Sequence, residues 1–301
     1  MGSVIPVMLE LFALILIGYY LGYKKVLDAN KNSGLSYLVS NIFCPAQVIA
    51  AVYAKGEMTS DGIVLQALYY GIGFYIVILL ITILFFSIYR CEEPDKTIYK
   101  MMFIFANTGF LGYPLMRALY GEYAVFIFSI MHMGYNLLMY TYGIYLLQKG
   151  VKLNIKSMLT PGLICSIASL ILYFGKIPLP ANVIDVFSLL GNATTPVSMI
   201  VIGVSLSLIP LKMLFENKKM IGMVLFRLTI IPVVFKVIMD FIPCDLFIRE
   251  LIVISSVLPA GSLIAIYANQ YKRHSEFASA IVIVSTVLSI ITMPVMLGIL
   301  L

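Results

Sequence analysis

The sequence predicts an all-α integral membrane protein with ten transmembrane helices, built as two inverted five-helix repeats with crossed, broken fourth and ninth helices. Three observations support this class. Of the 301 residues, 61% are hydrophobic and only 11% are charged, whereas about a quarter of a soluble domain is charged. Apolar stretches of about 20 residues, the length that spans a bilayer, recur along the chain. Two of these stretches, one in each half, contain polar residues, glycine and proline in mid-span.

The predicted spans follow one another with short loops. The first has no positive residue before it and no small-residue cleavage site after it, so we interpret it as a spanning helix and not as a signal peptide. The ten spans are 4–23, 33–54, 62–89, 97–119, 122–147, 157–175, 182–209, 217–241, 246–269 and 275–300.

Basic residues gather in alternate loops, as expected for a correct order of spans. Cytoplasmic loops carry an excess of Lys and Arg. This places both termini on the extracytoplasmic side of a cell membrane. The net charge of +6 therefore reflects loops and gives no reason to expect nucleic acid as a partner. The basic residues of the predicted cytoplasmic side are Lys24, Lys25, Lys31, Arg90, Lys96, Lys100, Lys149, Lys152, Lys156, Lys212, Lys218, Lys219, Lys272 and Arg273.

The predicted repeats occupy 1–148 and 157–301, joined by a cytoplasmic linker at 149–156. An odd number of helices in each half gives the halves opposite topology. The halves also share prolines: Pro45 and Pro196 lie in the second helix of each repeat, and Pro114 and Pro259 lie in the fourth. Inverted repeats place the substrate site of many secondary transporters at paired, discontinuous helices near the membrane midplane.

The two predicted breaks are the candidate substrate site. A helix interrupted in lipid must have its freed N–H and C=O groups satisfied by protein or by a water-filled cavity. Helix N-termini at a break favour anions, and an asparagine amide adds donors. The candidate substrate-binding residues are Asn107, Thr108, Gly109, Gly112, Tyr113 and Pro114 in the first break, and Ser256, Pro259, Gly261 and Ser262 in the second.

Two charged residues lie inside predicted spans. Charges within the membrane are costly and are functional candidates. Arg227 is a candidate substrate ligand, with snorkelling or a structural ion pair as the alternative. Glu10 is its candidate partner and a candidate for proton coupling, although it lies near the outer end of its span.

Enzymatic and metal chemistry are not expected. The four cysteines, Cys44, Cys91, Cys165 and Cys244, form no C-x-x-C pair, and the chain has only two histidines. This pattern argues against zinc or redox sites. No H-E-x-x-H, Ser-His-Asp or paired-carboxylate arrangement occurs in the spans. We therefore predict neither a metal nor a cofactor.

Six groups of residues, in order along the chain, resemble one transporter family. They are Gly18–Leu21 with Lys24 and Lys25; Gly34–Ser36 with Cys44–Ala46; Asn107–Gly109 with Gly112–Pro114; Pro196–Ser198 with Gly203–Leu206; Leu258–Ala260 with Tyr267–Tyr271; and Ser285–Thr286 with Thr292–Pro294. Their order and spacing resemble bacterial members of the auxin efflux carrier (PIN-like) family.

The resemblance implies a scaffold domain and a mobile transport domain that works by an elevator mechanism. It implies small organic anions such as malate as substrates, with Asn107 matching a position that contacts the substrate carboxylate. The long cytoplasmic loop of many plant members is absent, so auxin itself is not expected. A homodimer is an expectation from the resemblance alone.

The sequence thus favours a secondary transporter of organic anions in the lipid bilayer. Two alternatives stay open: a sodium- or proton-coupled symporter of another carboxylate or amphipathic substrate, and a membrane sensor that binds a ligand without moving it. The short loops disfavour the sensor, since no soluble domain remains to transmit a signal.

Overall fold

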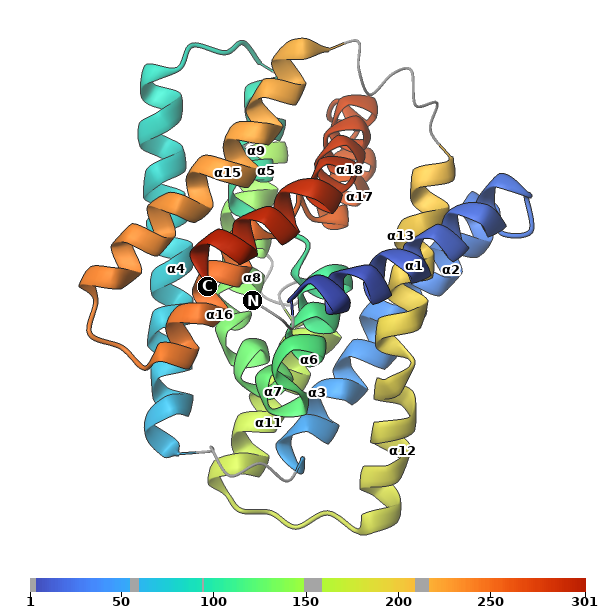
Figure 1. Ribbon diagram of the computed structural model, residues 1–301, viewed down its shortest axis with the longest axis vertical. Coiled ribbons are helices and arrows are strands. Elements are labelled where there is room, and N and C mark those ends of the chain that lie inside the picture. Colours follow the sequence, from blue (N-terminus) through green and yellow to red (C-terminus); the bar gives the residue numbers. More distant parts are fainter. Residues whose placement is uncertain (1–3, 55–59, 94, 149–158, 209–216) are drawn as a thin grey trace. The chain divides into compact units, whose positions relative to one another are not determined.

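The computed structural model describes residues 4–54, 60–93, 95–148, 159–208 and 217–301, and regular structure in these residues is helical (Figure 1). The one exception within this part of the chain is an isolated antiparallel bridge between Ala106 and Ala260. The predicted cytoplasmic linker at 149–156 lies outside the described residues.

Seven described stretches are long and apolar enough to cross a membrane. The helix at Pro161–Phe174 is apolar but shorter. The predicted spans 97–119 and 246–269 are each interrupted, whereas the count of ten spans and the inverted repeat remain predictions. The seven stretches are Ile5–Tyr23, Ala29–Val52, Asp61–Ile88, Glu122–Leu147, Ala181–Ser207, Lys218–Phe241 and Ser275–Leu300.

The described chain folds into two compact units, and each unit takes segments from both sequence halves. The first unit comprises Met1–Leu68, Gly109–Met133 and Leu159–Ile209, and the second comprises Tyr69–Thr108, Gly134–Met158 and Pro210–Leu301.

The first unit contains helices from three separate parts of the sequence. They are α1 (Val4–Tyr23), α2 (Ala29–Leu38), the π-helical turn η1 (Val39–Phe43), α3 (Cys44–Val52), the start of α4 (Asp61–Ile88), most of η2 (Thr108–Gly112), α6 (Tyr113–Tyr120), α7 (Glu122–Met131), α11 (Pro161–Phe174), α12 (Ala181–Asn192) and α13 (Thr194–Ser207).

Helices α1 and α13 lie side by side in this unit although they are far apart in sequence (Figure 1). Gly203 of α13 lies against the main chain of α1, where a Cβ would be 2.6 Å from the nitrogen of Tyr19 and would overlap the carbonyl oxygen of Ile15. Small residues allow such close backbone contact between membrane helices. The side chain of Asn32 on α2 adds a hydrogen bond of 2.9 Å to Ser205 Oγ on α13.

Two π-helical turns in the chain end directly before proline-containing helices. Pro45 is the second residue of α3, after η1, and Pro114 is the second residue of α6, after η2. Proline has no N–H to donate and its ring displaces the carbonyl four residues earlier. The preceding turn widens to a π pattern, which is typical of disturbed membrane helices and functional sites.

The second unit holds both interrupted helices. Its elements are the rest of α4, α5 (Asp95–Ile104), α8 (Met133–Leu138), η3 (Met139–Gly143), α9 (Ile144–Leu147), α15 (Lys218–Phe241), α16 (Leu246–Val257), α17 (Ser262–Gln270) and α18 (Ser275–Leu300).

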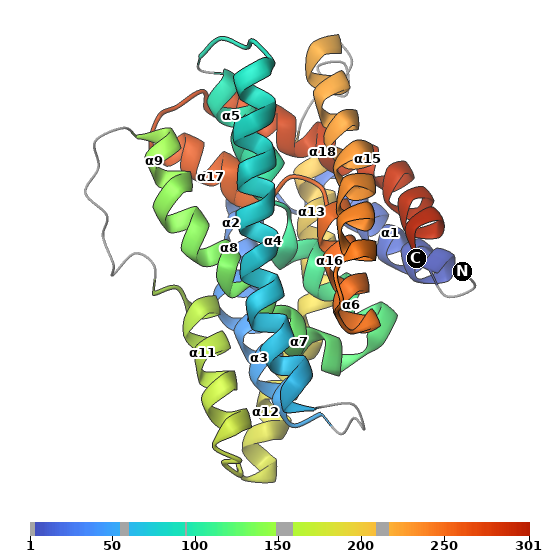
Figure 2. The same ribbon diagram turned by 90° about the vertical axis from the view of Figure 1, so that its left-hand side faces the viewer.

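Helix α15 is central to the packing of this unit. It contacts α16 and α18, and Figure 2 shows α15 and α16 side by side. Aromatic rings join α4 to its neighbours: Phe74 packs on Phe235 of α15, and Phe85 stacks on Phe103 of α5. These contacts hold α5 and α15 on the same helix, α4.

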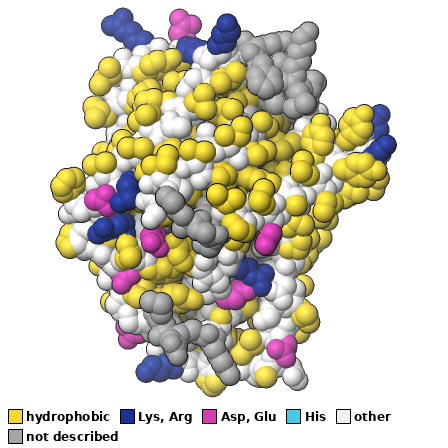
Figure 3. Space-filling model, viewed as in Figure 1, with side chains coloured by type: hydrophobic (Ala, Val, Ile, Leu, Met, Phe, Trp, Pro, Cys, Tyr) yellow, Lys and Arg dark blue, Asp and Glu magenta, His cyan; other side chains and the backbone are white. Residues whose placement is uncertain are grey.

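Hydrophobic side chains cover much of the surface shown in Figure 3. Large apolar residues are exposed on several of the long helices, among them Leu16 on α1, Leu84 on α4 and Ile291 on α18. A water-soluble protein would bury such side chains, whereas the hydrocarbon core of a bilayer accommodates them. The surface therefore agrees with a membrane-spanning protein.

Candidate functional site

The two interrupted segments meet within the second unit and pair through their main chains. Helix α5 ends at Ile104, helix α16 ends at Val257, and α17 begins at Ser262. The N–H of Asn107 donates to the carbonyl oxygen of Pro259 at 2.7 Å, and the N–H of Gly261 donates to the carbonyl oxygen of Phe105 at 2.9 Å. The predicted breaks are thus confirmed, and each break satisfies backbone groups of the other.

Gly261 allows this close approach. A Cβ at this position would lie 2.9 Å from the carbonyl oxygen of Ala106. Only a residue without a side chain fits such a contact between two main chains without a shift. The sequence marked Gly261 as a substrate-site residue, and the structure gives it a role in joining the two breaks.

A third element completes the pairing. The N–H of Ala260 donates to the hydroxyl oxygen of Ser285 on α18 at 2.8 Å, and Ser285 is fully buried. An unpaired N–H at this depth would be costly, so the serine replaces a missing helix carbonyl. Ser285 is not among the predicted site residues, because one serine in an apolar helix gives no sign of what lies opposite it.

Arg227 of α15 lies beside both breaks. Its side chain is only 2% exposed. The guanidinium donates from Nε to the carbonyl oxygen of Phe103 at 3.0 Å and from Nη1 to the carbonyl oxygen of Ser256 at 2.6 Å. Both partners are main-chain carbonyls, so these bonds are neither the ion pair nor the snorkelling that the sequence offered as alternatives, and the role of Arg227 as a substrate ligand stays a prediction.

Other predicted residues of the second unit lie at the same crossing. Asn107 and Thr108 are buried directly after the α5 break. The hydroxyl of Ser256 donates back to the carbonyl oxygen of Val253 at 2.6 Å, so its main chain, rather than its side chain, contacts Arg227. Ser262 is half-buried as the first residue of α17, where free N–H groups of a helix N-terminus are found. Pro259 contributes the carbonyl that Asn107 uses.

The remaining predicted residues belong to the first unit and are described within it. The Cys44 thiol donates to the carbonyl oxygen of Gly109 at 3.6 Å. Tyr113 is buried, and its ring is nearly perpendicular to that of Phe128, at 80°. Gly112 and Pro114 are buried at the junction of η2 and α6. Glu10 is exposed on α1, so its predicted partnership with Arg227 and its coupling role stay predictions.

Two aromatic pairs join elements of the second unit. The Tyr267 hydroxyl on α17 donates to the Tyr140 hydroxyl on η3 at 2.9 Å. Phe105 packs edge-on against Tyr135 of α8. The abundance of tyrosine in the chain concealed these residues from sequence reasoning.

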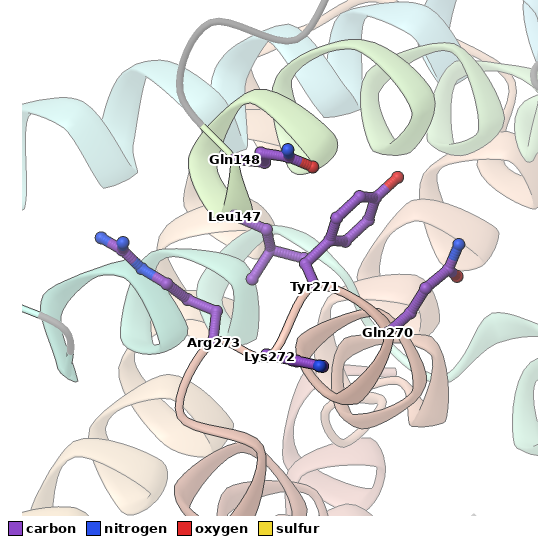
Figure 4. Close-up of a pocket in the computed structure, with 6 residues that line it drawn as sticks. All are labelled: Leu147, Gln148, Gln270, Tyr271, Lys272 and Arg273. Atoms are coloured by element: carbon purple, nitrogen blue, oxygen red, sulfur yellow. The ribbon is translucent and has the colours of Figure 1, made fainter.

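Two pockets lie within single units, away from the paired breaks. One, of about 500 Å³, is formed where α9 and α17 end, and Figure 4 shows the side chains of Arg273 and Tyr271 pointing apart. Arg273 also pairs with Glu93, so its charge is already compensated. The other, of about 240 Å³, is lined by Gln47 of α3 and Asn192 of α12. Neither contains a residue that the sequence singled out for its substrate site.

The described residues contain no group of three or more His, Cys, Asp or Glu side chains arranged to hold a metal ion. The polar groups at the crossing are main-chain amides and carbonyls, one guanidinium and uncharged side chains. Such groups can bind and orient a solute by hydrogen bonds.

Comparison with known proteins gives two findings. A family described as "Membrane transport protein" matches residues 3–153 and 147–297. The chain is also 23% identical over 303 residues to an uncharacterized transporter of Methanocaldococcus jannaschii, an alignment that covers 95% of this chain and 95% of the relative. Both matches extend over the two sequence halves and both interrupted helices.

Proposed function

Because this chain belongs to the auxin efflux carrier family of membrane transport proteins, we propose that it is a secondary transporter that moves small organic anions, such as malate, across the cell membrane. The family is one of transporters, and nothing in it points to an enzyme.

The observation that carries this proposal is the paired break in the second unit. Asn107, Ala260 and Gly261 give their N–H groups to the pairing and to Ser285, while α17 begins immediately beyond it. A helix N-terminus carries a partial positive charge and unpaired N–H groups that suit a carboxylate. The buried amide of Asn107, at the same crossing, would supply further hydrogen bonds.

We propose that the chain crosses the membrane ten times, as two inverted repeats of five helices. The seven long stretches, the shorter helix at Pro161–Phe174 and the two interrupted segments are compatible with that count. The division into two compact units supports an elevator mechanism, in which the unit that contains the paired breaks carries the substrate. Broken helices of this kind hold the substrate in many secondary transporters.

Coupling to an ion is a second part of the proposal that needs its own test. A sodium- or proton-coupled carrier is the alternative to a uniporter or exchanger. Glu10, which is exposed on α1, is the candidate proton carrier. In a sodium-coupled carrier, carbonyl oxygens left without a helical partner at a break would coordinate the sodium ion.

The test is counterflow of labelled malate in proteoliposomes, for the wild type and Asn107→Ala. We expect saturable exchange in the wild type and a severe loss in the variant. Asn30→Ala is the matched control, because it makes the same chemical change on an exposed part of α2. Normal flux through a folded Asn107→Ala protein would contradict a substrate site at the crossing.

The same vesicles separate the coupling alternatives. Counterflow that does not depend on sodium or on a pH gradient would favour a uniporter or exchanger, and loss of the pH response in Glu10→Gln would support proton coupling. Absence of malate flux in the wild type would exclude malate, and the assay would then be repeated with a panel of carboxylates. Binding of a carboxylate without flux would favour a sensor.

A further inference from the structure

Arg227 is the one charged side chain that is buried among the described residues. It lies in the interior of α15, a stretch long and apolar enough to span a membrane. None of the ion pairs formed by described residues of its unit includes it. A buried cation without compensation is strongly unfavourable, so the structure must balance this charge in another way.

The balance comes from two carbonyl groups that the helix breaks set free. In a continuous helix, the carbonyl of Phe103 would accept from the N–H of Asn107, four residues later. That N–H donates to Pro259 instead. Arg227 Nε takes its place at Phe103, at 3.0 Å.

The second break repeats the arrangement. The carbonyl of Ser256 would accept from the N–H of Ala260, which donates instead to Ser285. Arg227 Nη1 takes its place at 2.6 Å. In each broken helix, the guanidinium therefore binds the carbonyl whose helical N–H donor has another partner: Pro259 for Asn107, and Ser285 for Ala260.

The charges of these groups also balance. A helix C-terminus carries roughly half a negative elementary charge. The C-terminal ends of α5 and α16 both face Arg227, so two such ends together offset about one positive charge. The planar fork of arginine suits two separate acceptors, whereas a lysine ammonium is a single point charge.

We propose that Arg227 is the fixed counter-charge of the paired breaks: it neutralises the C-terminal ends of α5 and α16, locks the two breaks to each other, and so leaves the positive N-terminus of α17 to attract the substrate anion. Arg227 is thus a positioning residue that acts through the main chain and sets the charge preference of the site. The last step rests on the proposed transport of organic anions, whereas the neutralisation and the locking do not.

The first experiment measures hydrogen exchange in the purified protein and needs no substrate. The variants are Arg227→Lys, which keeps the charge, and Arg227→Gln, which keeps a donor without the charge. Lys236→Gln is the control, since it removes a positive charge from the same helix at a half-exposed pair with Asp240. The amides to follow are those of Asn107, Ala260 and Gly261.

In Arg227→Gln we expect these three amides to exchange together, faster by about tenfold or more, because hydrogen bonds to charged groups contribute more than neutral ones. Arg227→Lys should lie between Arg227→Gln and the wild type, and Lys236→Gln should match the wild type. Unchanged exchange in Arg227→Gln would overturn the proposal. Equal exchange in the Gln and Lys variants would overturn the role of the charge.

The second experiment tests the charge preference with labelled malate and its uncharged diamide as competitor. In Arg227→Gln we expect the KM for malate to rise by about tenfold, because the C-terminal ends of α5 and α16 would then carry uncompensated negative charge beside the anion, while inhibition by the diamide stays unchanged. Arg227→Lys should recover most of the affinity. An equal loss for malate and the diamide would show that Arg227 only supports the fold, and would overturn its part in charge preference.

The two experiments separate failure of this proposal from failure of the proposed function. If the wild type moves no malate, the malate proposal fails, and the exchange of the three amides in the Gln and Lys variants still decides whether Arg227 is the counter-charge. If malate is transported but Arg227→Gln keeps the wild-type KM, the charge preference is set elsewhere and this proposal fails alone.

Discussion

Gly261 shows how a single residue can determine whether two helices meet. Its hydrogen takes the space in which any other side chain would contact the carbonyl oxygen of Ala106, 2.9 Å from an added Cβ. The N–H of the same residue donates to Phe105. A change at this position therefore affects the steric fit and the hydrogen bond together.

We expect Gly261→Ala to destabilise the second unit by about 1–3 kcal/mol, the usual cost of overpacking, and to abolish transport. Thermal unfolding in detergent and counterflow measure the two effects. Gly222→Ala is the control, because a Cβ at Gly222 of α15 meets nothing within 4 Å and alanine favours a helix by roughly 1 kcal/mol. Equal stability of the two variants would contradict a tight contact at Gly261.

Single residues also show what the sequence could and could not reveal about the site. Asn107, Pro259 and Gly261 were predicted because polar residues, proline and glycine are unusual in an apolar span, and the structure places all three at the crossing. The partners of Arg227 were not predicted, because they are main-chain oxygens. Any residue type supplies a carbonyl, so the sequence carries no signal for it.

At the scale of helices, α1 and α13 depend on the absence of side chains along their contact. Gly203 and Gly18 each face the main chain of the opposite helix. Lipid offers no hydrophobic driving force between helices, so close packing supplies much of the attraction. The pairing should therefore be sensitive to one methyl group.

We expect Gly203→Ala to lower the melting temperature of the protein by several degrees, since separating the helices costs about 1–3 kcal/mol or more. Gly34→Ala is the control in the same unit, because a Cβ at Gly34 of α2 has no neighbour within 4 Å. The comparison uses thermal unfolding of both variants in one detergent. A melting temperature for Gly203→Ala equal to that of Gly34→Ala would contradict the close contact.

The hydroxyl pair between α17 and η3 gives a smaller, more local test. Tyr267 donates to Tyr140 at 2.9 Å. Tyr267→Phe keeps the ring and removes the donor, which should cost about 1 kcal/mol. Tyr37→Phe, on an exposed tyrosine of α2, should leave the unfolding midpoint unchanged. A Tyr267→Phe protein as stable as this control would mean that the pair contributes nothing.

The helices themselves were predicted better than their internal distortions. Hydrophobic length gave the positions of the long helices, and the polar interruptions gave both breaks. The register of the pairing, Ala106 opposite Ala260, was not predictable, because it depends on which residue of each loop approaches the other. The π turns before Pro45 and Pro114 were also missed, since proline alone permits either a kink or a widened turn.

At the scale of the whole molecule, the two compact units do not follow the order of the sequence. The sequence predicts the spans and the loop charges. It does not predict which helices pack together, because most of these helices are apolar on every face. In a chain that is hydrophobic throughout, amphipathic periodicity no longer distinguishes a lipid-facing residue from a buried one. The grouping of helices therefore required the structure.

The predicted orientation can be tested with native cysteines. Cys91 follows α4 on the predicted cytoplasmic side, and Cys244 follows α15 on the outer side; both are free and half-buried. In intact cells, an impermeant maleimide should label a variant that keeps only Cys244. It should label a variant that keeps only Cys91 solely after the cells are permeabilised. The reverse pattern would contradict the orientation.

The labelling of Cys91 should also depend on pH. Burial raises the pKa of the Cys91 thiol, while the nearby Lys219 ammonium acts in the opposite direction. The reactive thiolate is therefore scarce near neutral pH and increases as the pH rises. We expect faster labelling of Cys91 at alkaline pH. At any one pH, labelling should be slower in Lys219→Gln than in the wild type, because less thiolate is present.

The guanidinium of Arg227 binds main-chain oxygens, which every amino acid has whatever its side chain. This has a consequence for the evolution of the protein. Substitution of Phe103 or Ser256 leaves both acceptors in place, so relatives can diverge at these positions and keep the arrangement. To keep the arrangement, a relative needs only an arginine on the neighbouring helix and two helix interruptions at the same depth. Among relatives, the backbone fold at the breaks should therefore be conserved longer than the amino-acid sequence around them.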